Sequence, residues 1–134
     1  MKGIFHVRGA VEGPAIRLPT PLSFWGGVDA ETGRIIDQSQ THHGAFLGGK
    51  VLVMPSGRGS SSASSVLAET IRNGIGPIAI VMQRPDPIIT AGSMVARSLY
   101  GIVCPVVVCP IDGIKDGQTI RISEDGDQAL IEIS

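Results

Sequence analysis

Residues 50–82, KVLVMPSGRGSSSASSVLAETIRNGIGPIAIVM, decide the fold of this chain. Lys50–Met54 and Ile78–Met82 are apolar on both faces, as expected of strands that other elements cover on both sides. Between them lie apolar residues at helical spacing: Ala63, Val66, Leu67 and Ile71. Gly74 follows as a typical helix stop. The stretch therefore predicts a β-α-β unit with parallel strands and a right-handed crossover.

The same pattern continues with a second helix and a third strand. Asp86 supplies an N-cap and Pro87 a first-turn proline. We expect the buried stripe of this helix to consist of Ile88, Ala91, Val95 and Leu99. The helix ends at Tyr100-Gly101, and Val106–Val108 is the third buried strand. The centre of the chain is therefore predicted to be a parallel β-α-β-α-β core.

Antiparallel segments flank this core on both sides. Gly3–Leu18 alternates loosely with period 2, which is typical of a hairpin, with Gly9 and Gly13-Pro14 as turn or bulge points. Gln118–Ile122 and Ala129–Ile133 form a second predicted pair, joined by a solvated turn at Glu124–Asp127. The chain is therefore predicted to be α/β: a mixed β/α barrel with a parallel core and flanking antiparallel strands.

Length and charge limit the domain count and the classes of ligand. The chain has 134 residues, of which 43% are hydrophobic and 17% charged. Either half would be too short for a core, so we expect residues 1–134 to form one domain. Eleven Lys and Arg against twelve Asp and Glu give a net charge of -1, so neither nucleic acid nor a membrane surface is expected as a partner. The sequence contains neither a signal-peptide pattern nor a long apolar run, so the expected location is cytoplasmic.

Several residues that suggest chemistry also have simpler interpretations. Cys104 and Cys109 should point to opposite faces of a buried strand, which suits neither a disulfide nor a shared metal. His42 and His43 are either a metal pair or part of a solvated loop, and adjacent residues rarely bind one ion together. Asp29 is either a base or a turn residue that bonds its own backbone. No metal site on this chain is predicted.

The stretch from Ser56 to Ser65 is the most informative motif, because six of its ten residues are serine. It is a flexible linker, a helix cap, or a binding or catalytic loop. The stretch leaves a buried strand and enters a helix without spare length, which argues against a linker. At the carboxyl end of a parallel strand, glycines and free helix N–H groups favour an anionic ligand, and Arg58 adds a cation. A small carboxylate or phosphate substrate is therefore expected.

The residues of this loop also limit the chemistry. A serine removes a carbon-bound proton only beside a cation or a helix N-terminus, and only if the carbanion is stabilised. The loop offers both a cation, Arg58, and the N-terminus of the predicted helix. The sequence encodes no electrophile that takes a leaving hydroxyl, and it has neither a Walker lysine nor the third glycine of a dinucleotide fingerprint. The chain therefore has the pattern of half a site.

Two motifs carry a resemblance to a known family. Pro21–Asp29 (PLSFWGGVD) and Gly49–Ser62 (GKVLVMPSGRGSSS) resemble the small subunit of aconitase X, the swivelling β/β/α barrel domain of the aconitase superfamily. The similarity continues to Ile102 and so covers most of the chain. It implies a hydro-lyase, active only with a large subunit whose cysteines hold an iron or iron–sulfur centre. The small subunit closes over that centre, in a heterodimer or higher assembly, and supplies a serine base.

The resemblance also implies roles for the residues of the serine-rich motif. Aligning Gly59-Ser60-Ser61 with the Gly-Ser-Ser of aconitase loops places the catalytic base at Ser60. Gly59, Ser61 and Ser62 are then candidates for substrate binding. Ordinary aconitases have arginine where Ser62 stands, so Arg58 is the candidate substitute for binding the substrate carboxylate.

A second motif is also a candidate for substrate binding. Trp25, Gly26 and Gly27 are either a loop whose backbone approaches the substrate, with the indole excluding water, or a tight turn with an aromatic plug. We expect three Gly-rich segments to meet on one face of the barrel: this one, Gly44–Gly49 and Gly57–Gly59.

Two substrates are known in the family, cis-3-hydroxy-L-proline and (R)-5-phosphomevalonate. The loop Gly57–Ser62 is closer to the hydroxyproline type, whereas archaeal loops resemble Gly-Lys-Gly-Ser-Thr. The favoured function is therefore the small subunit of cis-3-hydroxy-L-proline dehydratase, which forms Δ1-pyrroline-2-carboxylate. In the implied mechanism the serine takes the α-proton and the metal of the large subunit assists departure of the 3-hydroxyl. The alternatives are a phosphomevalonate dehydratase small subunit, an anion-binding module without chemistry, and a structural subunit.

Overall fold

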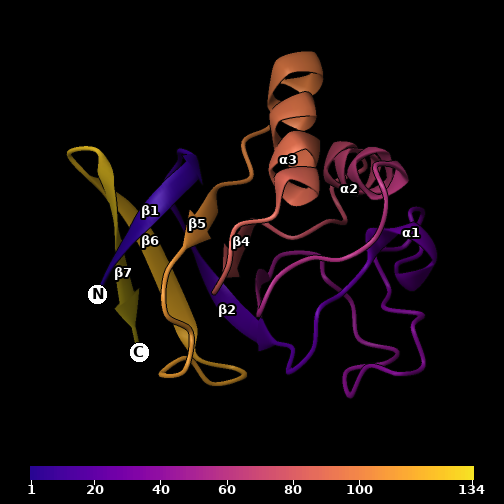
Figure 1. Cartoon of the computed structure of the whole chain (residues 1–134), viewed down its shortest axis with the longest axis horizontal. Coiled ribbons are helices and arrows are strands. Elements are labelled where there is room, and N and C mark those ends of the chain that lie inside the picture. Colours follow the sequence, from indigo (N-terminus) through magenta and orange to yellow (C-terminus); the bar gives the residue numbers. More distant parts are fainter.

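The computed structural model describes residues 1–134 and contains seven strands and three helices. The strands are β1 Lys2–Val7, β2 Val11–Arg17, β3 Val51–Met54, β4 Ala79–Met82, β5 Val106–Val108, β6 Thr119–Asp125 and β7 Gln128–Ile133. The helices are α1 Phe24–Gly27, α2 Ser62–Arg72 and α3 Pro87–Tyr100. The helices lie together on one side of the strands, and β6 and β7 lie on the other (Figure 1).

The strands close into a barrel in the order β1-β5-β4-β3-β2-β6-β7. β3, β4 and β5 are parallel neighbours, as the β-α-β-α-β pattern predicts. β2 adds a fourth parallel strand next to β3, which the sequence did not predict. The remaining pairs, β5–β1, β1–β7, β7–β6 and β6–β2, are antiparallel. The prediction of a mixed barrel with a parallel core and antiparallel flanks is confirmed.

The predicted N-terminal hairpin is wrong, because β1 and β2 do not pair. β1 pairs with β5 and β7, and β2 pairs with β3 and β6. An alternating pattern reports which side of a strand faces solvent, but it does not name the neighbouring strand. Here the two strands, although close in sequence, are not neighbours in the barrel. The C-terminal pair, β6 and β7, is a hairpin as predicted.

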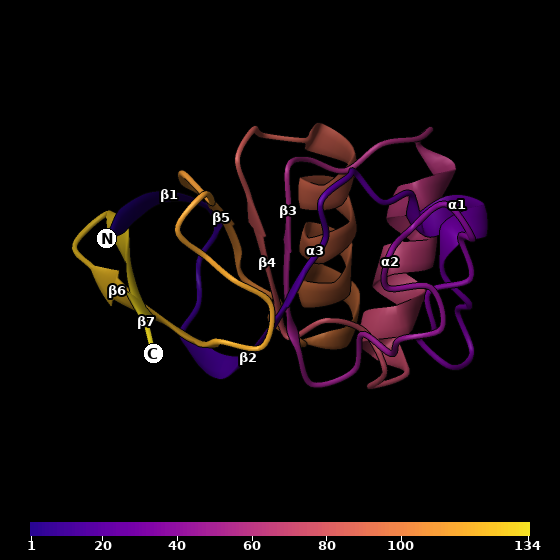
Figure 2. The ribbon, with the colours of Figure 1, turned by 90° about the horizontal axis from the view of Figure 1, so that it is seen from below.

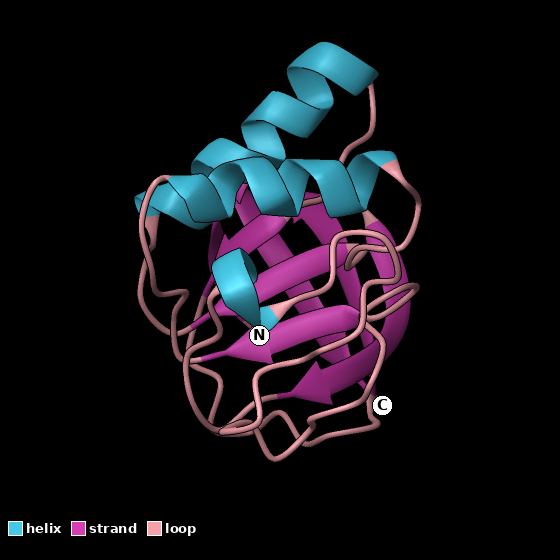
Figure 3. Ribbon diagram, turned by 90° about the vertical axis from the view of Figure 1, so that its right-hand side faces the viewer, coloured by secondary structure: helices cyan, strands magenta, loops and turns pink.

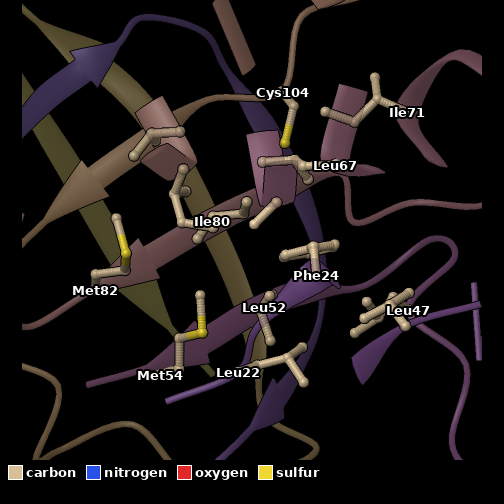
Figure 4. Packing of buried hydrophobic residues seen from close by; sticks show 14 of the residues in the cluster. Leu22, Phe24, Leu47, Leu52, Met54, Leu67, Ile71, Ile80, Met82 and Cys104 are labelled. Carbon is tan, nitrogen blue, oxygen red and sulfur yellow. The ribbon is translucent and has the colours of Figure 1, made fainter. Parts of the chain in front are cut away.

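Side chains from the parallel strands fill two separate cores. Val51 and Val53 of β3 point into the barrel, together with Val81 and Val107. Their neighbours in sequence point outward against the helices. This outer core includes Leu22, Phe24, Leu52, Met54, Leu67, Ile80 and Met82 (Figure 4). Every residue of β3 and β4 is buried, which is why both strands have continuous apolar sequences.

The two long helices pack on the outer face of β3 and β4. Seen from below, α3 lies next to these strands, and α2 and α1 follow beyond it (Figure 2). The helices cover one side of the barrel, and loops rather than helices run along its remaining strands (Figure 3). None of the helices combines the length and the hydropathy that crossing a membrane requires.

The caps of α3 follow the sequence, but its buried face does not. Asp86 Oδ1 accepts hydrogen bonds from the N–H groups of Ile88 at 2.8 Å and Ile89 at 3.3 Å, as a predicted N-cap should. The predicted buried stripe is wrong: Val95 is 40% exposed and Leu99 is 68% exposed. The residues that α3 buries are instead Ile89, Gly92, Ser93 and Ala96.

Close helix packing explains this difference. A Cβ atom on Gly92 would lie 2.8 Å from the carbonyl oxygen of Ser64 and 2.9 Å from Cδ2 of Leu67, both on α2. The hydroxyl of Ser93 donates to the carbonyl of Cys104. Small residues therefore face the interior because the two helices leave little space between them.

Candidate functional site

The serine loop, residues 55–61, runs from the carboxyl end of β3 to α2. The side chains of Ser60, Ser61 and Ser62 are exposed. The carbonyls of Ser60 and Ser61 accept hydrogen bonds from the first turn of α2, but Ser61, at the N-cap, makes no side-chain cap. No hydrogen bond within the chain uses any of these three hydroxyls. Helix capping therefore does not explain them, and all three are free to meet a ligand.

Two glycines fit the serine loop closely against its neighbours. Gly57 forms a parallel bridge with Leu22, and a Cβ atom on Gly57 would lie 2.5 Å from Cγ1 of Ile89. Gly59 has a φ of +113°, and a Cβ atom there would lie 2.6 Å from Oγ of Ser23. Any larger residue would displace the loop at these positions. The close packing of the loop at Gly57 and Gly59 therefore fixes the position of the backbone just before the three serines.

An open hollow of about 380 Å³ lies beside the serine loop. Its lining brings together four of the predicted binding residues, Trp25, Gly26, Gly27 and Arg58. The indole of Trp25 is 63% exposed, whereas the preceding Phe24 is fully buried. Phe24 is therefore the aromatic plug of this turn, and Trp25 is left at the mouth of the hollow. Ser60, Ser61 and Ser62 are not part of this lining.

Asp37 and Arg58 form the charged part of the hollow. Nη2 of Arg58 lies 3.7 Å from Oδ2 of Asp37, whose side chain is only 16% exposed. The hydroxyl of Ser39 donates to Asp37 at 2.6 Å, and its backbone N–H donates at 2.9 Å. The hydrogen bond from the Ser39 hydroxyl is the largest cause that lowers the pKa of the Asp37 carboxyl, and the one from the Ser39 backbone N–H is the second largest. Asp37 therefore stays ionised and holds Arg58 beside the hollow.

Arg84 is a site candidate that the sequence reasoning missed. Its backbone N–H donates to the carbonyl of Pro55 at 3.0 Å, and its Nη2 donates to Oγ of Ser56 at 3.4 Å. Arg84 follows β4 as the serine loop follows β3. Because parallel neighbours end at the same edge of a sheet, this position was the available signal. Asp37 and Ser39 gave no comparable signal, because they lie in an irregular segment.

The third Gly-rich segment is not at this edge, so the expectation of three loops on one face is wrong. Gly48 lies against Ile75, and Gly49 lines a separate pocket with Gly74 and Pro77. These residues lie at the amino ends of β3 and β4, opposite to the serine loop. Glycine content marks tight turns at both ends of the barrel and does not by itself mark a site.

The other candidate residues have structural roles. Oδ1 of Asp29 accepts the backbone N–H of Glu31 at 2.9 Å, as expected of a turn residue. Nε2 of His42 lies 3.1 Å from Oδ1 of Asp116, whereas His43 is close enough to Asp37 to contribute to its lowered pKa. The two adjacent histidines therefore face different carboxylates.

The residues of this chain do not fit an iron or iron–sulfur centre. No three His, Cys, Asp or Glu side chains come together. Cys104 belongs to the outer core and Cys109 to the barrel interior, which confirms that they point to opposite faces. Burial raises the pKa of the Cys104 thiol to about 12 and that of the Cys109 thiol to about 11, so neither thiol ionises readily.

A closed mixed barrel with a serine loop at the carboxyl end of its parallel strands defines the class of swivel domains. The model of the aconitase X swivel domain matches residues 1–133. The structure of Thermococcus kodakaraensis aconitase X superimposes with a TM-score of 0.86 and 32% identity, over 98% of each chain. The chain belongs to the aconitase X swivel domain family, which confirms the resemblance seen in the sequence.

Curated relatives in this family are of two kinds. A cis-3-hydroxy-L-proline dehydratase of Hypocrea jecorina is 42% identical over 115 residues, which is 86% of this chain. The chain spans only 19% of the length of that protein. A phosphomevalonate dehydratase small subunit of Methanocella arvoryzae is 34% identical over 134 residues, which is all of this chain and 98% of the relative.

Proposed function

We propose that residues 1–134 form one swivel domain that acts as the small subunit of a heteromeric aconitase X-type dehydratase, a cytoplasmic hydro-lyase. The observation that carries this proposal is the stretch of three unengaged serine hydroxyls at the start of α2, in a loop that also contains Arg58 and whose Ser56 accepts a hydrogen bond from Arg84. We assign the iron or iron–sulfur centre to the large subunit, because the residues of this chain do not fit one. The favoured substrate is cis-3-hydroxy-L-proline.

A second candidate substrate, (R)-5-phosphomevalonate, is favoured by one specific observation. Relatives named phosphomevalonate dehydratase small subunits match this chain with 34% identity over 134 residues and 39% identity over 132 residues. Both compounds carry a hydroxyl on the carbon next to the α-carbon of a carboxylate. A single arrangement of residues therefore serves either dehydration.

Ser60 is proposed to take the proton from the carbon next to the substrate carboxylate. The free N–H groups at the start of α2 favour an anionic oxygen on the serine. Loss of the β-hydroxyl as water then leaves a carbon–carbon double bond. With hydroxyproline, this product tautomerises to the cyclic imine Δ1-pyrroline-2-carboxylate.

The remaining predicted residues are proposed to hold the substrate. Ser61 and Ser62 offer hydroxyls next to Ser60, and Gly59 allows the substrate to approach the backbone. Trp25, Gly26 and Gly27 belong to the neighbouring hollow, where the exposed indole would exclude water once the large subunit closes over it.

Substitution of Ser60 tests this proposal. We expect Ser60→Ala, co-purified with the large subunit under anaerobic conditions, to lose at least about 100-fold in kcat, because it removes the proton acceptor. Ser65→Ala is the matched control, since Ser65 is exposed on α2 but lies one turn beyond the loop. Unchanged turnover of the Ser60 variant in an intact complex would rule out Ser60 as the base.

A further inference from the structure

Arg84 joins β4 to the first residues of the serine loop. Its backbone donates to Pro55 and its guanidinium donates to the hydroxyl of Ser56. A guanidinium has five N–H donors, and this one bond uses only one of them. The side chain of Arg84 is exposed. Most of its donors are therefore available beside the loop.

The charges around the two arginines of the site differ. Arg58 is paired with Asp37, whose carboxylate lies 3.7 Å away. Arg84 has no ion pair with any residue of the chain. The nearest acid in sequence, Asp86, uses its carboxylate to cap α3. Arg84 is therefore the site cation whose charge no carboxylate of the chain neutralises.

The strand order places Arg84 and the Trp25 hollow on opposite sides of the serine loop. β3 lies between β4 and β2 in the barrel, so the loop that follows β3 lies between the residues that follow its two neighbours. Gly57 of the loop forms a bridge with Leu22 on the β2 side. The same glycine lies against Asp86 on the β4 side, two residues beyond Arg84.

We propose that Arg84 binds an anionic oxygen group of the substrate, a carboxylate or a phosphate, on the side of the serine loop away from the Trp25 hollow. A guanidinium matches the two oxygens of such a group with parallel N–H bonds. The hydrogen bond to Ser56 orients the guanidinium group of Arg84 toward the serine loop. This inference rests on the proposed function for the identity of the substrate, but the binding of an oxyanion at Arg84 is testable without turnover.

Binding of simple oxyanions to the 134-residue chain tests Arg84 directly. Inorganic phosphate and acetate are titrated while the Nε–H signal of Arg84 and the amides of residues 56–62 are followed by NMR. Phosphate or acetate is expected to shift these signals, and Arg84→Gln is expected to weaken that binding about tenfold or more. Arg97→Gln is the matched control, since Arg97 is an exposed arginine of α3 without an ion pair. Equal binding by wild type and Arg84→Gln, or equal weakening by both variants, overturns the proposal.

Kinetics of the complex with the large subunit identify the group that Arg84 binds. If Arg84 binds the carboxylate, Arg84→Gln raises KM about tenfold for both cis-3-hydroxy-L-proline and (R)-5-phosphomevalonate, and Arg84→Lys recovers part of the loss. If Arg84 binds the phosphate, only the KM for phosphomevalonate rises. An unchanged KM for every compound that is turned over contradicts the proposal. Absence of all turnover together with intact phosphate binding contradicts the proposed function and supports an oxyanion site.

Discussion

At the scale of single residues, the carboxylate of Asp37 organises the charged side of the hollow. Its pKa is lowered from the ordinary value of 3.8, first by the Ser39 hydroxyl and then by the Ser39 backbone, with a smaller contribution from Arg58. Because the folded-state pKa is lowered, ionised Asp37 stabilises the fold above its ordinary pKa. That contribution is lost as the pH falls through the lowered value.

The order of these causes predicts how two substitutions differ. Ser39→Ala removes the largest cause, so it should raise the pKa of Asp37 toward 3.8 by more than Arg58→Gln does. A pH titration of the Asp37 carboxyl carbon by NMR measures both shifts. A larger rise in the Arg58 variant would mean that the ion pair, and not Ser39, keeps Asp37 ionised.

Single residues also show what the sequence can predict about the site. Ser60 and Arg58 became candidates because they lie in one unusual stretch between a buried strand and a helix. Arg84 lies 28 residues from Ser56, and only the parallel pairing of β3 and β4 brings the two together. Asp37, which pairs with Arg58, lies in an irregular segment that no periodic pattern describes. Contacts within a motif are predictable, whereas contacts between motifs depend on the fold.

At the scale of elements, α3 illustrates the limits of hydrophobic periodicity. The helix has apolar residues on more than one face, and several of the larger ones are exposed, including Met94 at 55% and Leu99 at 68%. The small residues face α2 because a glycine and a serine allow the two helices to approach closely. Side-chain size at the contact, which a hydrophobic count ignores, decided which face is buried. The N-cap of the same helix was predictable, because Asp86 acts on its own neighbours.

This packing predicts that Gly92→Ala destabilises the protein. The new methyl group would meet the backbone of Ser64 at 2.8 Å, and overpacking of this kind costs about 1–3 kcal/mol. The higher helix propensity of alanine offsets about 1 kcal/mol of that cost. Urea unfolding measures the net loss, with Ser98→Ala on the exposed face of α3 as the control. A Gly92 variant as stable as wild type would show that the helices separate easily.

At the scale of the whole molecule, the cores that stabilise the barrel are separate from the candidate site. The interior and outer cores bury both faces of the parallel strands, and the resulting continuous apolar sequences made the central β-α-β-α-β unit predictable. Closure of the barrel through β1 and β7 was less predictable in detail, since it pairs strands from the two ends of the sequence. The candidate site lies where β2, β3 and β4 end, away from the C-terminal hairpin.

The same arrangement supports the proposal that the chain supplies half of a catalytic site. The serine loop and the start of α2 supply hydroxyls and N–H groups, and Arg58 and Arg84 supply cations, but no residues of this chain fit a metal centre. The hollow beside Trp25 is open, and a second subunit is proposed to close it. The proposal therefore requires that neither subunit is active alone.

The most direct test is an anaerobic dehydratase assay of this chain, the aconitase X large subunit, and the two mixed. Each sample receives cis-3-hydroxy-L-proline or (R)-5-phosphomevalonate, and the unsaturated product or cyclic imine is quantified. We expect turnover of one of these compounds only in the mixture. Turnover by the large subunit alone at the rate of the mixture, or turnover by the 134-residue chain alone, would contradict the assignment of this chain as the half that supplies the base.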